Sequence, residues 1–298
     1  MTIYSNLDRF GVSGAYLEGL KWIEMLEANH SLSQKEEWQV NEMKALLLNE
    51  RGNQDEFLPI WYKLLKQYRE ADRPEDVGKC LLTIANHFIM LEDYENALPL
   101  YKEAYQLALE HKSIELQQVS GIMLIKYLCG ARYYSESLEY YNKIKPEIAF
   151  NPSMQNEVVK SYMELNKPDS ARIYLAARLL SERGDKIVLN CMMAETYITE
   201  ELEDSAFVFL DRPMKSYKER AKNYQKKGKE PILPNCFLSP CYSFADLLWK
   251  KGKIQQASQY YMIVEPLMKE RVKTPVRMEL QIKALTNFSS FCRETKQY

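Results

Sequence analysis

Glycine, proline and histidine are scarce in this chain of 298 residues, which has 10 glycines, 12 prolines and 3 histidines. Because sandwiches, barrels and glycine-looped α/β enzymes need many tight turns, so little glycine argues against all three. Three histidines leave little material for acid–base or metal chemistry. His30, His87 and His111 lie far apart in the sequence, so we expect no shared catalytic site. These absences indicate a helical, non-catalytic protein.

The sequence also lacks an excess of charge of either sign and any long apolar run. It has 40 basic and 41 acidic residues, so no overall field would attract nucleic acid or an anionic membrane. No apolar stretch of about 18 residues is present, so we expect no membrane insertion. The first residues show no signal peptide. These features favour the cytoplasm, with the periplasm as the alternative if an upstream signal was removed.

Cysteine spacing gives little support for a metal site. The six cysteines are scattered singly, and only Cys236 and Cys241 are close in sequence. No histidine or second cysteine pair accompanies them, so buried free thiols are a better interpretation than zinc ligation. Glycine loops that bind phosphate and the common hydrolase motifs are absent too. We therefore expect no metal, no cofactor and no enzymatic activity.

A repeated pattern is the main positive feature of the sequence. A residue that is often aromatic is followed by a small residue and then a large apolar one, as in Tyr94-x2-Ala97-x3-Tyr101. About 12 residues before each small residue comes a second pattern, as in Ile84-Ala85-x2-Phe88. Both spacings place their residues on one helical face. Short polar linkers between the two patterns predict antiparallel helix pairs, with the small residue where the two backbones approach most closely.

Further copies of the first pattern run along the chain. They are Tyr16-x2-Gly19-x3-Ile23, Tyr134-x2-Ser137-x3-Tyr141, Pro168-x2-Ala171-x3-Leu175, Glu203-x2-Ala206-x3-Leu210, Ile254-x2-Ala257-x3-Tyr261 and, with a bulky residue in place of the small one, Gln54-x2-Phe57-x3-Trp61. The pattern resembles the tetratricopeptide repeat, a family that carries Leu, Gly or Ala, Tyr, Ala, Phe and Ala at six positions. The matching residues in this chain are Ile84, Ala85, Phe88, Ala97, Tyr101 and Ala104. The resemblance implies an all-α fold, a right-handed superhelix (α-α solenoid) of about seven helix pairs. A generic helical bundle with chance repetition is the alternative.

The resemblance covers nearly the whole chain and implies a single solenoid over residues 1–298. We expect repeats at roughly 1–35, 38–71, 78–111, 118–151, 152–185, 187–211 and 238–271, with a partial repeat or cap at 276–298. Residues 212–237 are expected to hold an inserted helix, starting after Pro213 and ending at Gly228, and an irregular connector. We expect the basic residues of this insertion to form a solvated helix face, with contact to an anion or nucleic acid as the alternative. The partial repeat is either a solvating cap or the cut end of a longer protein with a further domain.

The resemblance also implies a binding surface, because in this family the first helix of each pair lines a concave wall. Transferring the family's wall positions one by one gives Leu82, Ile89, Ile122, Met163, Cys191 and Ile198 together with eight principal candidate residues: Asn86, Lys126, Asn156, Lys160, Glu195, Tyr242, Asp246 and Trp249. The wall would be cationic around Lys126 and Lys160, and acidic towards Glu195 and Asp246. Tyr242 and Trp249 would supply apolar contact area. Such a wall suits an extended peptide with a carboxylate near the lysines and a basic group further along. The alternative is that these residues only solvate the groove.

The sequence therefore predicts a non-catalytic scaffold that binds a peptide or protein segment in a groove and does not bind nucleic acid through this region. A second hypothesis follows from a resemblance to bacterial tetratricopeptide regulators. It makes the chain the ligand-sensing region of a larger transcriptional regulator or membrane-anchored sensor whose effector part is absent. A hydrolase or lyase built from helix pairs would need acids or histidines clustered on one wall, and the histidines are not clustered.

Overall fold

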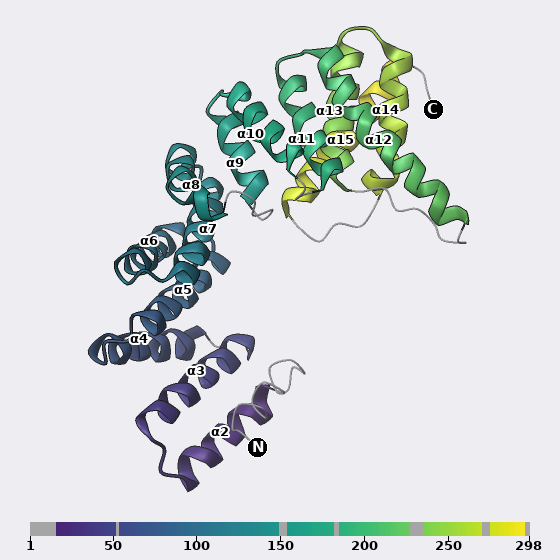
Figure 1. Ribbon diagram of the computed structural model, residues 1–298. Helices are drawn as coiled ribbons and strands as arrows, with labels where there is room; N and C mark the ends of the chain where they lie inside the picture. The colour runs from purple at the N-terminus through teal and green to yellow at the C-terminus, as the bar shows by residue number, and fades with distance from the viewer. Residues whose placement is uncertain are drawn as a thin grey trace. The chain divides into compact units, whose positions relative to one another are not determined.

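The computed structural model describes residues 16–51, 54–148, 154–181, 185–226, 235–269 and 275–295, and these ranges form helices joined by short turns (Figure 1). They contain no β-strand. The chain divides into two compact units, Met1–Ala149 and Phe150–Tyr298. The predicted all-α class is confirmed, and the single solenoid over the whole chain stays a prediction.

The first unit holds helices of nearly uniform length. They are α2 (Tyr16–Asn29), α3 (Gln34–Arg51), α4 (Gln54–Glu70), α5 (Pro74–Met90), α6 (Tyr94–Glu110), α7 (Ile114–Gly130) and α8 (Tyr134–Ile148). Each helix packs against the next in sequence. The expected pairs α3–α4, α5–α6 and α7–α8 are therefore present, with the small residue of the pattern on α6 and α8 and Phe57 in its place on α4.

The second unit continues the alternation. Its elements are α9 (Gln155–Glu164), α10 (Pro168–Leu180), α11 (Lys186–Thr199), α12 (Glu203–Lys226), the 3-10 helix η2 (Asn235–Phe237), α13 (Leu238–Lys250), α14 (Ile254–Lys269) and α15 (Pro275–Thr295). The pairs are α9–α10, α11–α12 and α13–α14. First helices of neighbouring pairs also touch, since α11 contacts α13 and α13 contacts α15.

The small residues of the repeat are buried where the paired helices meet. Ala97, Ala171, Ala206 and Ala257 all have no exposed surface. Ser137 is equally buried, and its hydroxyl donates a hydrogen bond of 2.9 Å from α8 to the Ile125 carbonyl oxygen of α7. The register predicted from the sequence therefore corresponds to real close approaches between helices.

The described three-residue turns, within helix pairs and between them, share one backbone conformation. In the turn from α5 to α6, Glu92 has a φ of 59°. Its N–H donates to the Ile89 carbonyl, and the Asp93 N–H donates to the Phe88 carbonyl, which is a Schellman motif. The residues with positive φ in the described turns are Asp72, Glu92, Lys112, Arg132, Asn166, Glu201 and Gly252. Only one of them is glycine, although this conformation favours glycine.

One expectation about the insertion is wrong. The helix predicted to start after Pro213 is not separate, because α12 runs without a break from Glu203 to Lys226 with Pro213 inside it. A proline removes one helical N–H, but packing can hold the helix together across it. Met214 is 8% exposed and belongs to the core of the second unit, and Tyr217 packs against the same core. Most of the expected connector, 227–234, lies outside the described residues, as do the expected repeat ends at 1–15 and 296–298.

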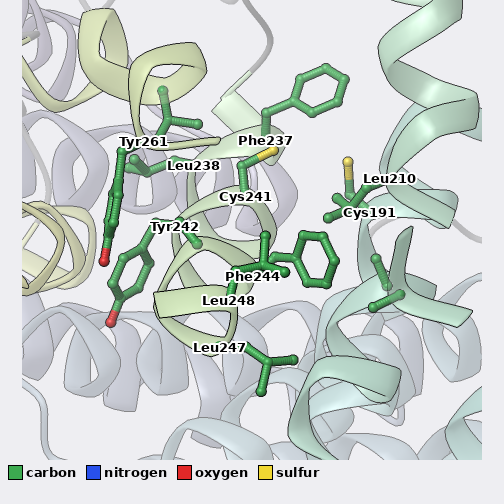
Figure 2. Close-up of a cluster of buried hydrophobic side chains, with 14 of the residues drawn as sticks. Cys191, Leu210, Phe237, Leu238, Cys241, Tyr242, Phe244, Leu247, Leu248 and Tyr261 are labelled. Atoms are coloured by element: carbon green, nitrogen blue, oxygen red, sulfur yellow. The ribbon is translucent and has the colours of Figure 1, made fainter. Parts of the chain in front are cut away.

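The main core cluster of the second unit includes two of the helices that form the candidate site, α11 and α13. It joins side chains of α11, α12, η2, α13, α14 and α15 (Figure 2). Phe237, Phe244, Tyr261 and Phe291 are among its largest members, each at most 1% exposed. α13 is buried on several sides at once, so few of its residues remain available for a ligand.

Candidate binding groove

A cavity of about 500 Å³ lies among α9, α11 and α13, the first helices of three successive pairs in the second unit. Its lining combines apolar, hydroxyl, amide and charged side chains. The lining residues are Asn156, Val159, Lys160, Met163, Met192, Glu195, Thr196, Ile198, Thr199, Ser239 and Ser243. Three of the eight residues predicted from the sequence, Asn156, Lys160 and Glu195, are brought together here.

Helical periodicity explains why these side chains share the cavity. On α9, Asn156, Val159, Lys160 and Met163 follow the i, i+3, i+4, i+7 spacing of one helical face. Val158, one position away from this face, is fully buried. The helix therefore presents one face to the core and another to the cavity, which remains open.

Lys160 and Glu195 give the cavity two opposite charges. Lys160 is exposed on α9, and Glu195 is half-buried on α11. Desolvation raises the pKa of the Glu195 carboxyl above its usual range, and a hydrogen bond with the Ser239 side chain opposes this shift. No ion pair joins Lys160 to Glu195 in the described part of the chain. Neither charge is therefore neutralised by the other.

Two other predicted residues already serve the fold. The Tyr101 hydroxyl of α6 donates to the Asn86 side-chain oxygen of α5. In the same way, the Tyr261 hydroxyl of α14 donates to one carboxylate oxygen of Asp246 on α13. The second oxygen of Asp246 accepts a hydrogen bond of 2.5 Å from the Asn287 amide. In both pairs, the tyrosine lies 15 positions after its acceptor.

Two of the three helix pairs that line the cavity, α9–α10 and α11–α12, lack this tyrosine. Fifteen positions after Lys160 stands Leu175, and fifteen positions after Glu195 stands Leu210. Both leucines are fully buried. Since a leucine side chain neither donates nor accepts a hydrogen bond, Lys160 and Glu195 have no corresponding partner at this position of their own repeats. These two side chains are therefore available to a ligand in a way that Asn86 and Asp246 are not.

The remaining predicted residues lie outside the cavity. Lys126 is exposed on α7 of the first unit, with its ammonium 5.3 Å from the centre of the Tyr127 ring. Tyr242 is only 3% exposed and belongs to the core cluster of Figure 2. Trp249 is half-buried and makes an edge contact with Phe291 at 5.5 Å between ring centres. The expectation that Tyr242 supplies apolar contact area to a ligand is therefore wrong, because its side chain is buried in the core.

Sequence analysis missed the hydroxyl groups of the site. Ser239 and Ser243 line the cavity from α13, four positions apart on one face, and Thr196 and Thr199 line it from α11. Ser243 stands two positions before the small residue Ala245, so inspecting that repeat position would have found it. Ser239 lies one turn earlier, near the start of α13, where the repeat pattern gives no signal.

Metal and membrane functions find no support in the described residues. Within these ranges, no group of three or more His, Cys, Asp or Glu side chains could hold a metal ion. A search of the same residues finds no helix with the length and apolar character needed to cross a bilayer. The cavity therefore offers only hydrogen-bonding, ionic and apolar contacts.

No protein-family model matches the sequence, and no curated protein matches it either. Among solved structures, the C-terminal part of a TPR (tetratricopeptide) repeat-containing protein from Cytophaga hutchinsonii aligns with a TM-score of 0.62 and 10% identity. That alignment covers 93% of this chain and 98% of the other. The pentatricopeptide repeat protein PPR10 from maize aligns with 16% identity over 99% of this chain and 43% of the PPR10 chain. Its TM-score of 0.44 is too low to support an argument. The tetratricopeptide-like helical-repeat fold predicted from the sequence is therefore confirmed, as a fold.

Proposed function

We propose that this chain is a non-catalytic binding scaffold, and that the groove formed by α9, α11 and α13 holds an extended segment of a partner protein or a peptide. The observation that supports the proposal is the pair Lys160 and Glu195. These two side chains of opposite charge line one cavity, do not pair with each other and lack the tyrosine partner that binds Asn86 and Asp246. Grooves of this kind bind segments by combining apolar contact with a few oriented polar groups.

Each lining group has a definite role in this proposal. Lys160 binds a carboxylate of the ligand, and Glu195 binds an ammonium or guanidinium group. Asn156 hydrogen-bonds to the ligand's peptide groups, since its amide both donates and accepts. Met163 and Met192, which adapt to different shapes, contact the apolar side chains between the two charged groups.

The pKa of Glu195 adds a pH dependence. Its carboxyl has a pKa above its usual range because of desolvation. A cationic group binds the ionised carboxylate, so affinity is present above this pKa and falls as the pH decreases through it. The loss therefore begins at a higher pH than it would for a solvated glutamate.

A peptide library tests the proposal with the full chain. The probe is a set of synthetic peptides without secondary structure, immobilised on a surface. Each peptide carries one carboxylate and one lysine, and the spacing between them varies across the set. We expect saturable binding of the wild-type chain to a subset with a defined spacing. Lys160→Glu or Glu195→Gln should weaken that binding by at least about tenfold, because each leaves a charged group of the ligand unpaired.

Matched controls separate the groove from general charge effects. Lys167→Glu and Glu164→Gln change exposed residues of the same unit that do not line the cavity. Both should leave the affinity unchanged, and circular dichroism should show that all four variants stay folded. If the wild-type chain binds no member of the set, or if groove and control variants bind equally well, the proposal is wrong.

The second hypothesis, a sensing region of a larger bacterial regulator, would use the same groove for its ligand. The charge variants therefore test the site under both hypotheses. A natural reading frame that continues into an effector domain would favour the sensor, and one without such a domain would favour the scaffold.

A further inference from the structure

A second cavity of the second unit, the α12–α14 cavity, lies among α12, α13 and α14 (Figure 1) and measures about 470 Å³. It shares no lining residue with the groove of α9, α11 and α13. Because the two cavities have no side chain in common, a substitution in one need not change ligand binding in the other.

One wall of the α12–α14 cavity is a single face of α12. Its lining residues follow the spacing i, i+3, i+7, i+10, which keeps side chains on one side of a helix. They are Asp204, Phe207, Asp211 and Met214. Phe207 is 50% exposed, whereas Met214 is 8% exposed. An aromatic ring that is half open to solvent therefore lies between two acidic groups.

The rest of the lining is largely apolar, with a few amides. Phe244 and Leu248 of α13 are at most 2% exposed (Figure 2). The Phe244 ring meets the Tyr260 ring of α14 edge to face, with 4.9 Å between the ring centres. Gln256 and Ile263 line the cavity from the same face of α14 as Tyr260. The packed α13 side chains thus give the cavity a preformed apolar floor.

Acidic groups outnumber basic ones around this cavity. Lys253 is the basic residue of its described lining, and its ammonium pairs with the Glu203 carboxylate. Asp211 pairs at 2.7 Å with Lys215, whose side chain is 73% exposed, and such an exposed pair contributes little free energy. Asp204 makes no ion pair within the described ranges. Two carboxylates on one face of α12 are therefore available to a cationic ligand.

The spacing of these two carboxylates favours a helical ligand over an extended one. Seven residues of an α-helix rise about 10.5 Å, which is the separation of Asp204 and Asp211 along α12. Two basic residues seven positions apart on a partner helix have the same separation and face the same side. An extended strand covers about 10 Å in three residues, but residues three apart point to opposite faces. Only the helix therefore presents both cations to the cavity.

We propose that the α12–α14 cavity is a second docking site, which binds a basic amphipathic helix of a partner protein. Two lysine or arginine side chains of that helix, seven positions apart, bind Asp204 and Asp211. An apolar side chain four positions after the first of them enters the cavity and contacts Phe207 and the α13 floor. The occupant is a helix with one basic and apolar face, and its binding does not depend on any ligand of the groove.

Two synthetic helical peptides test the proposal with the full chain. The matched peptide is rich in alanine and glutamine, has capped ends, and carries two lysines seven positions apart with a leucine four positions after the first. The shifted peptide has the same composition, but its second lysine stands two positions later, on the opposite face of the helix. Calorimetry at low salt should show saturable binding of the matched peptide, at least about fivefold tighter than that of the shifted peptide.

Variants of α12 locate the binding site. Asp204→Asn and Asp211→Asn should each weaken binding of the matched peptide by at least about threefold, and Phe207→Ala should do so by a similar factor. Glu219→Gln and Val208→Ala change exposed residues of the same helix that do not line the cavity. These two matched controls should leave the affinity unchanged, and circular dichroism should show that all five variants stay folded.

Glu195→Gln separates this site from the groove, because it should leave binding of the matched peptide unchanged. The docking proposal is wrong if the chain does not bind the matched peptide, if both peptides bind equally well, or if cavity and control variants have equal affinities. Sedimentation velocity covers the remaining alternative. A wild-type dimer that Asp204→Asn dissociates would make a second copy of the chain the occupant and would overturn the proposal.

Discussion

Tyrosines on the second helices determine which groove residues remain available. Tyr101 and Tyr261 donate hydrogen bonds to Asn86 and Asp246, so these two groove positions contribute to packing. The fixed separation of 15 residues between acceptor and tyrosine is visible in the sequence, and leucine at the same separation marks the positions that lack this hydrogen bond. A groove residue is thus better predicted from its repeat partner than from its own position alone.

His87 is a second residue whose environment has a measurable consequence. It is 3% exposed, its ring lies 4.8 Å from the Phe57 ring, and neither of its nitrogens has a hydrogen-bond partner in the described ranges. Desolvation lowers its pKa below 6.5. As the pH falls below 6.5, the unfolded chain takes up a proton that the folded chain does not, so the free energy of unfolding should fall.

Urea unfolding at about pH 7.5 and about pH 5.5 measures this effect. The wild-type chain should lose stability towards the lower pH, by no more than about 1.4 kcal/mol per pH unit for this one group. The loss should shrink in His87→Leu, whereas His111→Gln, which changes an exposed histidine, should retain it. An equal pH dependence in the wild-type chain and His87→Leu would contradict the assignment.

At the scale of helices, the small residues fix how closely paired helices approach. Ala171 of α10 is fully buried, whereas Ala177 of the same helix is exposed. Ala171→Leu should lower the free energy of unfolding by about 1–3 kcal/mol, because the added atoms have no space. Ala177→Leu should change it by less than about 0.5 kcal/mol. Equal effects of the two substitutions in urea unfolding would mean that the repeat register is not what spaces these helices.

The turns revise the explanation of the low glycine content, which composition alone attributed to a lack of tight turns. Left-handed turn residues are needed at every described three-residue linker, and the chain fills most of them with charged or amide residues. Such a residue costs about 1 kcal/mol relative to glycine there, partly offset by the greater flexibility of glycine when unfolded. The low glycine content therefore reflects tolerated strain rather than an absence of positions that suit glycine.

Replacing one of these residues tests this interpretation. Glu92→Gly, in the turn from α5 to α6, should raise the free energy of unfolding by up to about 1 kcal/mol. Lys79→Gly, at an exposed position inside α5, should lower it by about 1 kcal/mol. Thermal or urea unfolding of the two variants gives the comparison, and destabilisation by Glu92→Gly would contradict the account of the turns.

Helix positions could be predicted from the sequence because the pattern repeats and each copy supports the others. The paired helices and the buried small residues Ala97 and Ala257 follow from spacing alone. Pro213 misled the prediction, since a proline ends many helices but this one is held by packing that the sequence does not show. Tyr242 is buried for the same kind of reason, because α13 meets several neighbours at once.

At the scale of the whole molecule, the division into two units could not be predicted from the repeat pattern. A repeat pattern predicts local helix pairs equally well along the chain, so it does not mark the boundary between Ala149 and Phe150. It also does not show which stretch of groove forms a cavity. That depends on the combination of Lys160, Glu195 and the α13 hydroxyls within the second unit, which only the packed structure brings together.

Charge reversal across the groove tests the central claim most directly. The probe is the tightest-binding peptide of the set and a second peptide in which its lysine is replaced by glutamate. Both are measured by calorimetry against the wild-type chain and Glu195→Lys. We predict that Glu195→Lys binds the first peptide more weakly than the wild-type chain does and the second peptide more tightly. The coupling free energy between the two changes should be at least about 1 kcal/mol. If the two changes are additive within about 0.5 kcal/mol, Glu195 does not contact the ligand and the groove assignment is wrong.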